Sequence, residues 1–179
     1  MPTFSSDYFP HAFSINYCGY KNLGSINKPS KRFIYAFKTS KNKKYLIYVE
    51  EFPFKVYILK FFLKSHTNSE NRFTLMTNDA QGIRVLSTCF TAIIHFKKEI
   101  DQDASFGFMG AQKPSEESEV NTQRFRIYSR KGKTFFDPER FIHVENKNNS
   151  SYLILDKKVH SDETIPKIQQ MFESIYPTL

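Results

Sequence analysis

Hydrophobic and polar positions alternate along the first part of the chain, as they do in strands with one buried face. β-Branched and aromatic residues dominate four such segments, at 32–38, 45–51, 55–63 and 72–76. The lysine-rich residues 41–44 predict a turn between the first two strands, and Pro53 interrupts the pattern before the third. In the third strand, Val56, Ile58 and Phe62 predict a buried row. Together these segments predict an antiparallel meander.

The period then lengthens from two residues to about 3.6, which is typical of an amphipathic helix. Apolar residues recur three or four positions apart at Val85, Leu86, Cys89, Ile93, Phe96 and Ile100. The helix is expected to begin near Asn78 or Asp79, whose side chains can accept hydrogen bonds from its first backbone amides. Because Cys89 falls on the apolar face, we expect a buried thiol there and not a nucleophile.

Strand and helix patterns alternate in the second half of the chain. Residues 104–110 predict a buried strand that ends at a turn. Residues 141–145 and 152–155 predict a hairpin, and the apolar spacing over 164–176 predicts a terminal helix. These elements indicate that helices and strands are mixed in one α+β arrangement.

Periodicity alone leaves residues 122–136 open between two structures. Arginines alternate with Phe125 and Ile127, which suits a hairpin that turns at 130–133. The segment fits a helix equally well, because a helix would place Arg126, Arg130 and Lys133 on one face and the aromatic residues on another.

Charge adds information because it is uneven. The chain has 26 lysines and arginines against 18 acids, and no acid occurs between Asp7 and Glu50. The basic residues of that interval equal the whole net excess of +8, and such a stretch favours polyanions at the surface. A solvated lysine-rich loop would have the same composition. The candidate binding residues in this interval are Lys31, Arg32, Lys41, Lys43 and Lys44.

A second basic segment spans residues 124–133, and no acid occurs between Glu119 and Asp137. Guanidinium groups form paired hydrogen bonds with phosphates and carboxylates, so this segment is the main candidate for a polyanion or an acidic partner. The alternative is a solvated basic face opposite a buried aromatic row. The candidate residues are Arg124, Arg126, Arg130, Lys131 and Lys133, with Tyr128 as a stacking surface.

No motif in the sequence names a reaction. The five histidines lie far apart, and zinc-binding or serine-nucleophile signatures are absent, so no catalytic residue and no metal ligand is predicted. Cys18 and Cys89 indicate free thiols in a reducing cytosol. The first ten residues lack a signal-peptide pattern, and Lys or Glu interrupts every later apolar stretch. We therefore expect a cytoplasmic protein that does not enter a membrane.

Several short strings and their order resemble small uncharacterised bacterial proteins classed as domains of unknown function. The strings lie at 54–61, 77–79, 84–88, 108–111 and 124–130, within a resemblance that covers residues 33–156. It implies an α+β domain in a bacterium, favours a helix over 122–136 and implies no activity. The chain departs from those relatives by an acidic insertion after Gln112.

The order of elements is also similar, more loosely, to that of the GNAT-type N-acetyltransferases. In that family a glycine-rich turn opens the long helix, and its backbone N–H groups bind the pyrophosphate of acyl-CoA. The matching positions here are Gln81 and Gly82, with only one glycine and with Asp79 placing a negative charge nearby. The likeness implies an acyl-CoA-dependent acyltransferase as the alternative function.

The sequence predicts one α+β domain at 31–179, after an irregular segment at 1–30 and with a mobile acidic insertion near 112–121. An antiparallel or mixed sheet of about six to seven strands would accompany a long central helix, a second basic helix and a C-terminal helix. The function we expect is a non-enzymatic module that binds nucleic acid or an acidic protein and needs no cofactor. An interaction subunit of a bacterial defence or mobile-element system is a further hypothesis.

Overall fold

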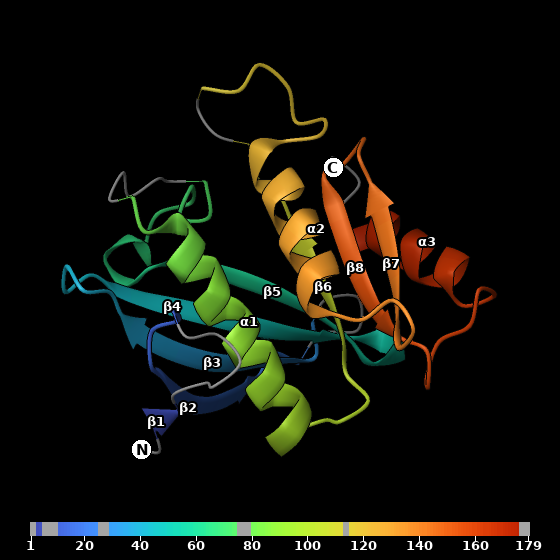
Figure 1. Ribbon diagram of the computed structural model, residues 1–179, viewed down its shortest axis with the longest axis horizontal. Helices are drawn as coiled ribbons and strands as arrows, with labels where there is room; N and C mark the ends of the chain where they lie inside the picture. The colour runs from blue at the N-terminus through green and yellow to red at the C-terminus, as the bar shows by residue number, and fades with distance from the viewer. Residues whose placement is uncertain (1–2, 5–10, 25–28, 75–79, 113–114, 176–179) are drawn as a thin grey trace.

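A mixed β-sheet forms the centre of the structure (Figure 1). The computed structural model describes residues 3–4, 11–24, 29–74, 80–112 and 115–175. Within them, eight strands lie in the order β1-β2-β3-β4-β5-β6-β8-β7, and three α-helices cover the two faces. The predicted α+β class is confirmed, with eight strands in place of six to seven.

The described helices and strands have the following bounds. The strands are β1 (Thr3–Phe4), β2 (Ile15–Asn22), β3 (Lys31–Lys38), β4 (Lys44–Phe52), β5 (Val56–Leu63), β6 (Ser105–Met109), β7 (Phe141–Asn146) and β8 (Ser151–Asp156). The helices are α1 (Gly82–Glu99), α2 (Gln123–Phe135) and α3 (Ile165–Ile175), with short 3-10 turns at Pro53–Lys55 and Lys64–His66.

The meander from β1 to β5 is antiparallel throughout, as its alternating pattern predicts. In β4, Ile47 and Val49 are buried in the core shared with α1, while Tyr48 between them is only half-buried on the other face. Val56, Ile58 and Phe62 of β5 are all buried, which confirms the predicted row.

A parallel step follows the meander, because α1 crosses over the sheet and returns the chain beside β5. Only Val56, Tyr57 and Ile58 pair with β6, although β5 continues to Leu63. The next strand in space, β8, is antiparallel to β6 and separates it from β7. Beyond Ile58, β5 therefore diverges from β6. Helix α2 packs over this part of the sheet.

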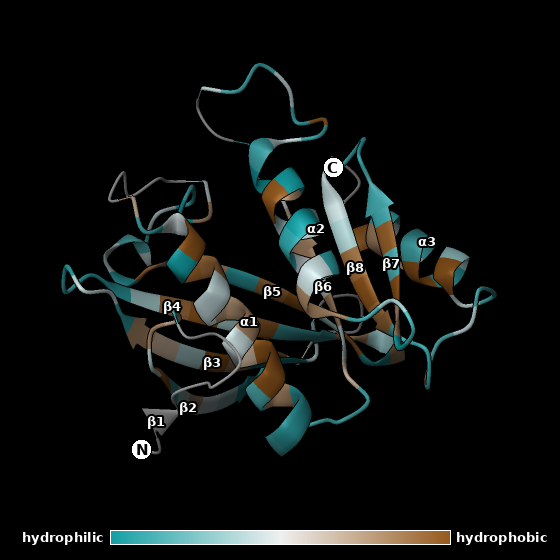
Figure 2. Cartoon of the chain, viewed as in Figure 1, coloured by the Kyte–Doolittle hydropathy of each residue, from teal (hydrophilic) through white to brown (hydrophobic). Residues whose placement is uncertain are grey.

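The two faces of the sheet carry separate apolar clusters. Helices α1 and α2 lie on one face, over a large core rich in phenylalanine and tyrosine. On the other face α3 covers a smaller cluster, in which Ile168 packs with Val56, Leu153 and Leu155. In Figure 2 the strands are largely brown or white, and hydrophilic residues gather in the loops and in bands of α2.

Two local predictions are wrong. Residues 71–74 form turns and not a strand, since the Thr74 N–H donates to the Asn71 carbonyl 2.9 Å away; residues 75–76 lie outside the described part. The segment expected to be irregular contains β2, which pairs with β3 despite its polar residues. A shift in register between Tyr17 and Tyr20 accommodates Gly19, whose φ is +93°.

The acidic residues near 112–121 are attached to the body of the protein where they are described. The Glu116 carboxylate accepts a 2.5 Å hydrogen bond from the backbone N–H of Gln123, and the Ser150 hydroxyl donates to the Glu119 carbonyl at 2.5 Å. The backbone N–H of Asn121 donates to the Lys147 carbonyl at 2.8 Å. These contacts fix the approach of the chain to α2.

Candidate functional site

Residues 123–135 form a helix, which decides between the two structures that the periodicity left open. Thr122 is the N-cap: its side-chain oxygen accepts from the Phe125 N–H at 3.3 Å and donates to the Gly110 carbonyl at 2.6 Å. Phe125, Tyr128 and Gly132 face the sheet and are buried. The resemblance to the small bacterial proteins favoured this helix, and docking on the sheet buries Phe125 and Tyr128 of its aromatic row.

Two of the predicted binding residues serve the interior of the protein instead. The Arg124 guanidinium donates to the carbonyls of Phe73 and Thr74, at 2.5 and 3.1 Å, and so ties α2 to the turn that follows β5. Tyr128 is buried between Phe61 and Phe108, with ring centroids 6.3 and 5.6 Å away. Burial raises the pKa of the Tyr128 phenol well above its usual range. The prediction of Tyr128 as a surface for stacking is therefore wrong.

Three of the predicted cations do lie together on the exposed side of α2: Arg126, Arg130 and Lys133. We call these three residues the α2 basic face. Arg126 donates to the carbonyl of Asn121, just before the helix, and the Lys133 ammonium lies 3.0 Å from a Glu145 carboxylate oxygen. Within the described chain Arg130 forms no ion pair. Lys131 is half-buried and lies off this face.

One acid and one further cation border the α2 basic face. The Glu145 carboxylate accepts a hydrogen bond from the Ser129 hydroxyl, and this bond together with Lys133 lowers the pKa of Glu145. The exposed Lys147 follows β7 in the turn whose carbonyl receives the Asn121 N–H. Lys147 is not among the predicted binding residues, because only the tertiary fold brings this turn beside the start of α2.

The structure does not gather the N-terminal basic residues into one surface. Lys31 and Arg32 begin β3, where Lys31 lies 4.0 Å from Glu51 and Arg32 forms a 2.6 Å ion pair with Glu50. Lys41, Lys43 and Lys44 lie at the opposite end of the strand, roughly 20 Å away at about 3.3 Å per residue. In Figure 1 the turn between β3 and β4 lies at the far left, away from α2.

The positions of the alternative cofactor site are partly described. Gln81 is the N-cap of α1 and makes no side-chain capping bond, and Gly82 is the first residue of the helix. Asn78 and Asp79, which we expected to cap it, lie outside the described residues.

Other candidate chemistry is limited in the described part of the chain. No group of three or more His, Cys, Asp or Glu side chains there could hold a metal ion. Cys89 is fully buried, and burial raises the pKa of its thiol, as its place on the apolar face predicted. None of the described helices combines the length and apolar character needed to cross a membrane.

Comparison with known proteins gives no relative: no family model, no curated protein and no solved structure matches this chain. Function is therefore inferred from the residues of this chain alone.

Proposed function

We propose that the protein is a non-enzymatic binding module that holds a polyanion, with nucleic acid as the ligand class, on the α2 basic face. One observation supports the proposal above the others. Helix α2 has no acid over its 13 residues, and it presents Arg126, Arg130 and Lys133 to solvent on one side while its other side is buried.

The spacing of these cations suits a phosphate backbone. Lys133 lies seven positions after Arg126, which is about 10 Å along a helix that rises about 1.5 Å per residue. One strand of duplex DNA carries a phosphate about every 3.4 Å of helix axis, so the α2 basic face spans about three phosphates. Guanidinium groups form two parallel hydrogen bonds with a phosphate, and two of the three cations are arginines.

The bordering carboxylate limits how strong this contact can be. Glu145 already neutralises part of the Lys133 charge across 3.0 Å. Arg130 has no such partner in the described chain, so it is the residue that contributes most to phosphate binding in this proposal. Lys147 adds a fourth positive charge beside the helix start.

A binding assay with charge reversal tests the proposal. Fluorescence anisotropy with labelled duplex DNA, single-stranded DNA and RNA at low salt is expected to show saturable binding that Arg130→Glu weakens at least tenfold. The matched control is Lys167→Glu, an exposed cation of α3 on the opposite face of the sheet, which should leave binding unchanged. Equal losses in both variants would indicate an effect of net charge alone and contradict a site on α2. No binding to any of the three nucleic acids would remove the nucleic-acid class and leave an acidic protein as the partner to test.

A second candidate is a GNAT-like acyl-CoA-dependent acyltransferase, and the chain order of elements favours it. That likeness rests on the order of elements along the chain: a meander from β2 to β5, then α1, β6, α2 and the pair β7–β8. The first backbone amides of α1, which the Gln81 side chain does not cap, are groups that could receive a phosphate. The single glycine of this turn counts against it.

Thermal denaturation with acetyl-CoA distinguishes the two candidates. A ligand at a hundred times its Kd adds about 2.7 kcal/mol to the free energy of unfolding. For a chain of this size, that is a rise of about 5–11 °C in Tm. An unchanged Tm at millimolar acetyl-CoA would contradict the acyltransferase. A rise that survives Arg130→Glu would place acyl-CoA away from the α2 basic face.

A further inference from the structure

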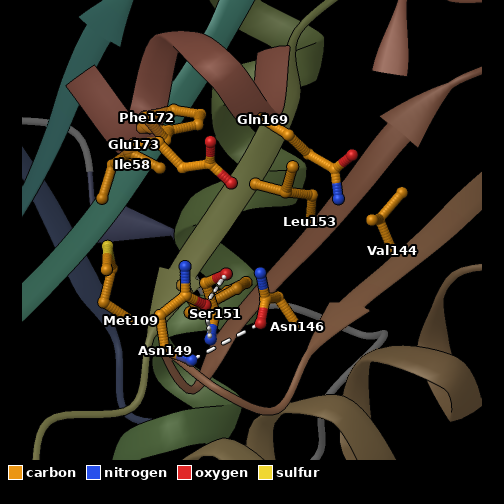
Figure 3. Close-up of a pocket in the computed structure, with 11 residues that line it drawn as sticks. Ile58, Met109, Val144, Asn146, Asn149, Ser151, Leu153, Gln169, Phe172 and Glu173 are labelled. Atoms are coloured by element: carbon orange, nitrogen blue, oxygen red, sulfur yellow. Dashed lines mark hydrogen bonds between the residues drawn. The ribbon is translucent and has the colours of Figure 1, made fainter. Parts of the chain in front are cut away.

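A pocket opens on the face of the sheet that α3 covers, opposite α1 and α2 (Figure 3). Its enclosed volume is only about 30 Å³, so the pocket is shallow and a ligand there would stay partly in contact with solvent. Its lining combines apolar groups with a few convergent polar ones, as in ligand sites of proteins. No residue of the α2 basic face lines the pocket, so it is separate from the proposed polyanion site.

Apolar side chains from five elements form the hydrocarbon part of the pocket, Val144 of β7 among them. Ile58 comes from β5, Met109 from β6, Leu153 from β8 and Phe172 from α3. Ile58 and Leu153 meet beneath Gly107, where an added Cβ would lie 2.5 Å from Ile58 Cδ1 and 2.8 Å from Leu153 Cδ2. This surface fits an aliphatic group.

Hydrogen bonds fix the orientation of two amides on one wall of the pocket. The Asn146 side-chain oxygen accepts from the backbone N–H groups of Asn148 and Asn149, at 3.0 and 3.4 Å. The Asn149 side-chain oxygen accepts from the N–H and hydroxyl of Ser151, at 3.2 and 2.7 Å. Because both oxygens receive N–H donors, the NH₂ groups are the ends left to face the pocket, as Figure 3 shows. This wall offers hydrogen-bond donors to an anionic or carbonyl oxygen.

A carboxylate lies on the other wall. Glu173 of α3 points its carboxylate toward the pocket. Glu173 lies in the last turn of the helix, where the helix dipole disfavours a negative charge, and that turn contains no basic residue. Within the described residues it forms no salt bridge. The exposed carboxylate is therefore available to pair with a cationic ligand group.

We propose that this pocket binds a small zwitterion, an amino acid with an apolar side chain. The ligand carboxylate accepts hydrogen bonds from the amide NH₂ groups of Asn146 and Asn149. The ligand ammonium pairs with Glu173, and its aliphatic side chain lies against Leu153 and Ile58. All three parts of the ligand thus meet groups of matching chemistry.

Titration of the full chain with leucine and its two truncated forms tests the recognition of both charges. The probes are L-leucine, 3-methylbutylamine, which lacks the carboxylate, and 4-methylpentanoate, which lacks the amine; methionine and valine extend the series. ¹⁵N–¹H spectra report directly on the side-chain NH₂ groups of Asn146 and Asn149. Saturable shifts are expected for at least one of the three amino acids. Removal of either charged group should weaken binding about tenfold or more, as expected for loss of a charge-assisted hydrogen bond.

Glu173→Gln separates recognition from fold, with Glu163→Gln, an exposed acid outside the pocket, as the matched control. The Glu173 variant should weaken amino-acid binding about tenfold and leave 4-methylpentanoate unaffected. The Glu163 variant should match the wild type, and unchanged Tm values show that both variants are folded. No saturable shift with any of the three amino acids at about 10 mM, or equal affinity in the Glu173 variant, would overturn the proposal.

Discussion

Gly110 sits where the end of β6 meets the start of α2, and its replacement by alanine should displace that helix. A Cβ at this position would lie 2.6 Å from the Phe125 backbone nitrogen and 2.7 Å from both Phe125 Cβ and Thr122 Oγ1. The first of these atoms belongs to backbone, and Thr122 and Phe125 are 1 % and 2 % exposed, so neither can turn aside into solvent. The clash can be relieved only if α2 moves or β6 bends.

The expected loss of stability combines two effects. Overpacking a filled interior costs about 1–3 kcal/mol. A shift of Thr122 also weakens its cap of α2, and loss of an N-cap costs about 0.5–2 kcal/mol. We therefore expect Gly110→Ala to lower the free energy of unfolding by about 2–4 kcal/mol. At about 2–4 °C per kcal/mol for a chain of this size, Tm falls by about 4–16 °C.

Urea denaturation followed by circular dichroism measures the change, and Gly82→Ala is the matched control. Gly82 begins α1, and no atom of the described residues lies within 4 Å of an added Cβ there. The control should stay within about 0.5 kcal/mol of the wild type or become slightly more stable, since alanine is the better helix former. If Gly110→Ala were as stable as Gly82→Ala, the docking of α2 on β6 described here would be wrong.

Further predictions concern buried charge and protonation. Glu50 is 2 % exposed and pairs with Arg32 and Lys60, so Glu50→Gln should lower the free energy of unfolding by about 1–3 kcal/mol in urea. That is less than for a fully buried pair, because both cations keep about a quarter of their surface in water; the exposed Glu70→Gln should show no loss. Burial lowers the pKa of three histidines: His95, His143 and His160. The unfolded chain then binds these protons at higher pH than the folded one, so stability should fall as the pH drops below about 6.5 and level off below the folded pKa values. The slope is at most about 1.4 kcal/mol per pH unit for each histidine, and equal stability at about pH 7.5 and 5.5 would contradict this assignment.

The parts of the fold that the sequence predicted are those where local pattern and burial agree. Strand β4 alternates buried and half-buried residues, and the long spacing through α1 was unambiguous because the helix is buried along most of one side. Residues 72–76 have a similar alternation, but the carbonyls of Phe73 and Thr74 accept hydrogen bonds from Arg124 and not from a neighbouring strand. Strand β2 was missed because Ile15 is its only buried residue, so its sequence has no alternating apolar row.

The candidate site was only partly predictable, because it depends on contacts across the sheet. The shared face of Arg126, Arg130 and Lys133 follows from helical spacing once the helix is known. Arg32 pairs with Glu50 because of the register between β3 and β4, and this register cannot be predicted from a short stretch of sequence. The pocket beneath α3 combines residues from five elements and the turn after β7, so it had no signal in the sequence.

The salt dependence of DNA binding tests the central claim, phosphate contact by the α2 basic face, most directly. Three phosphate contacts predict a slope of about −2.7 in a plot of log K against log salt concentration, or about a 40-fold loss of affinity between 50 and 200 mM salt. Removing one contact with Arg130→Gln should reduce the slope to about −1.8, while Lys167→Gln leaves it at the wild-type value. A slope that Arg130→Gln does not change would contradict the account, because the phosphates would then be bound elsewhere on the protein.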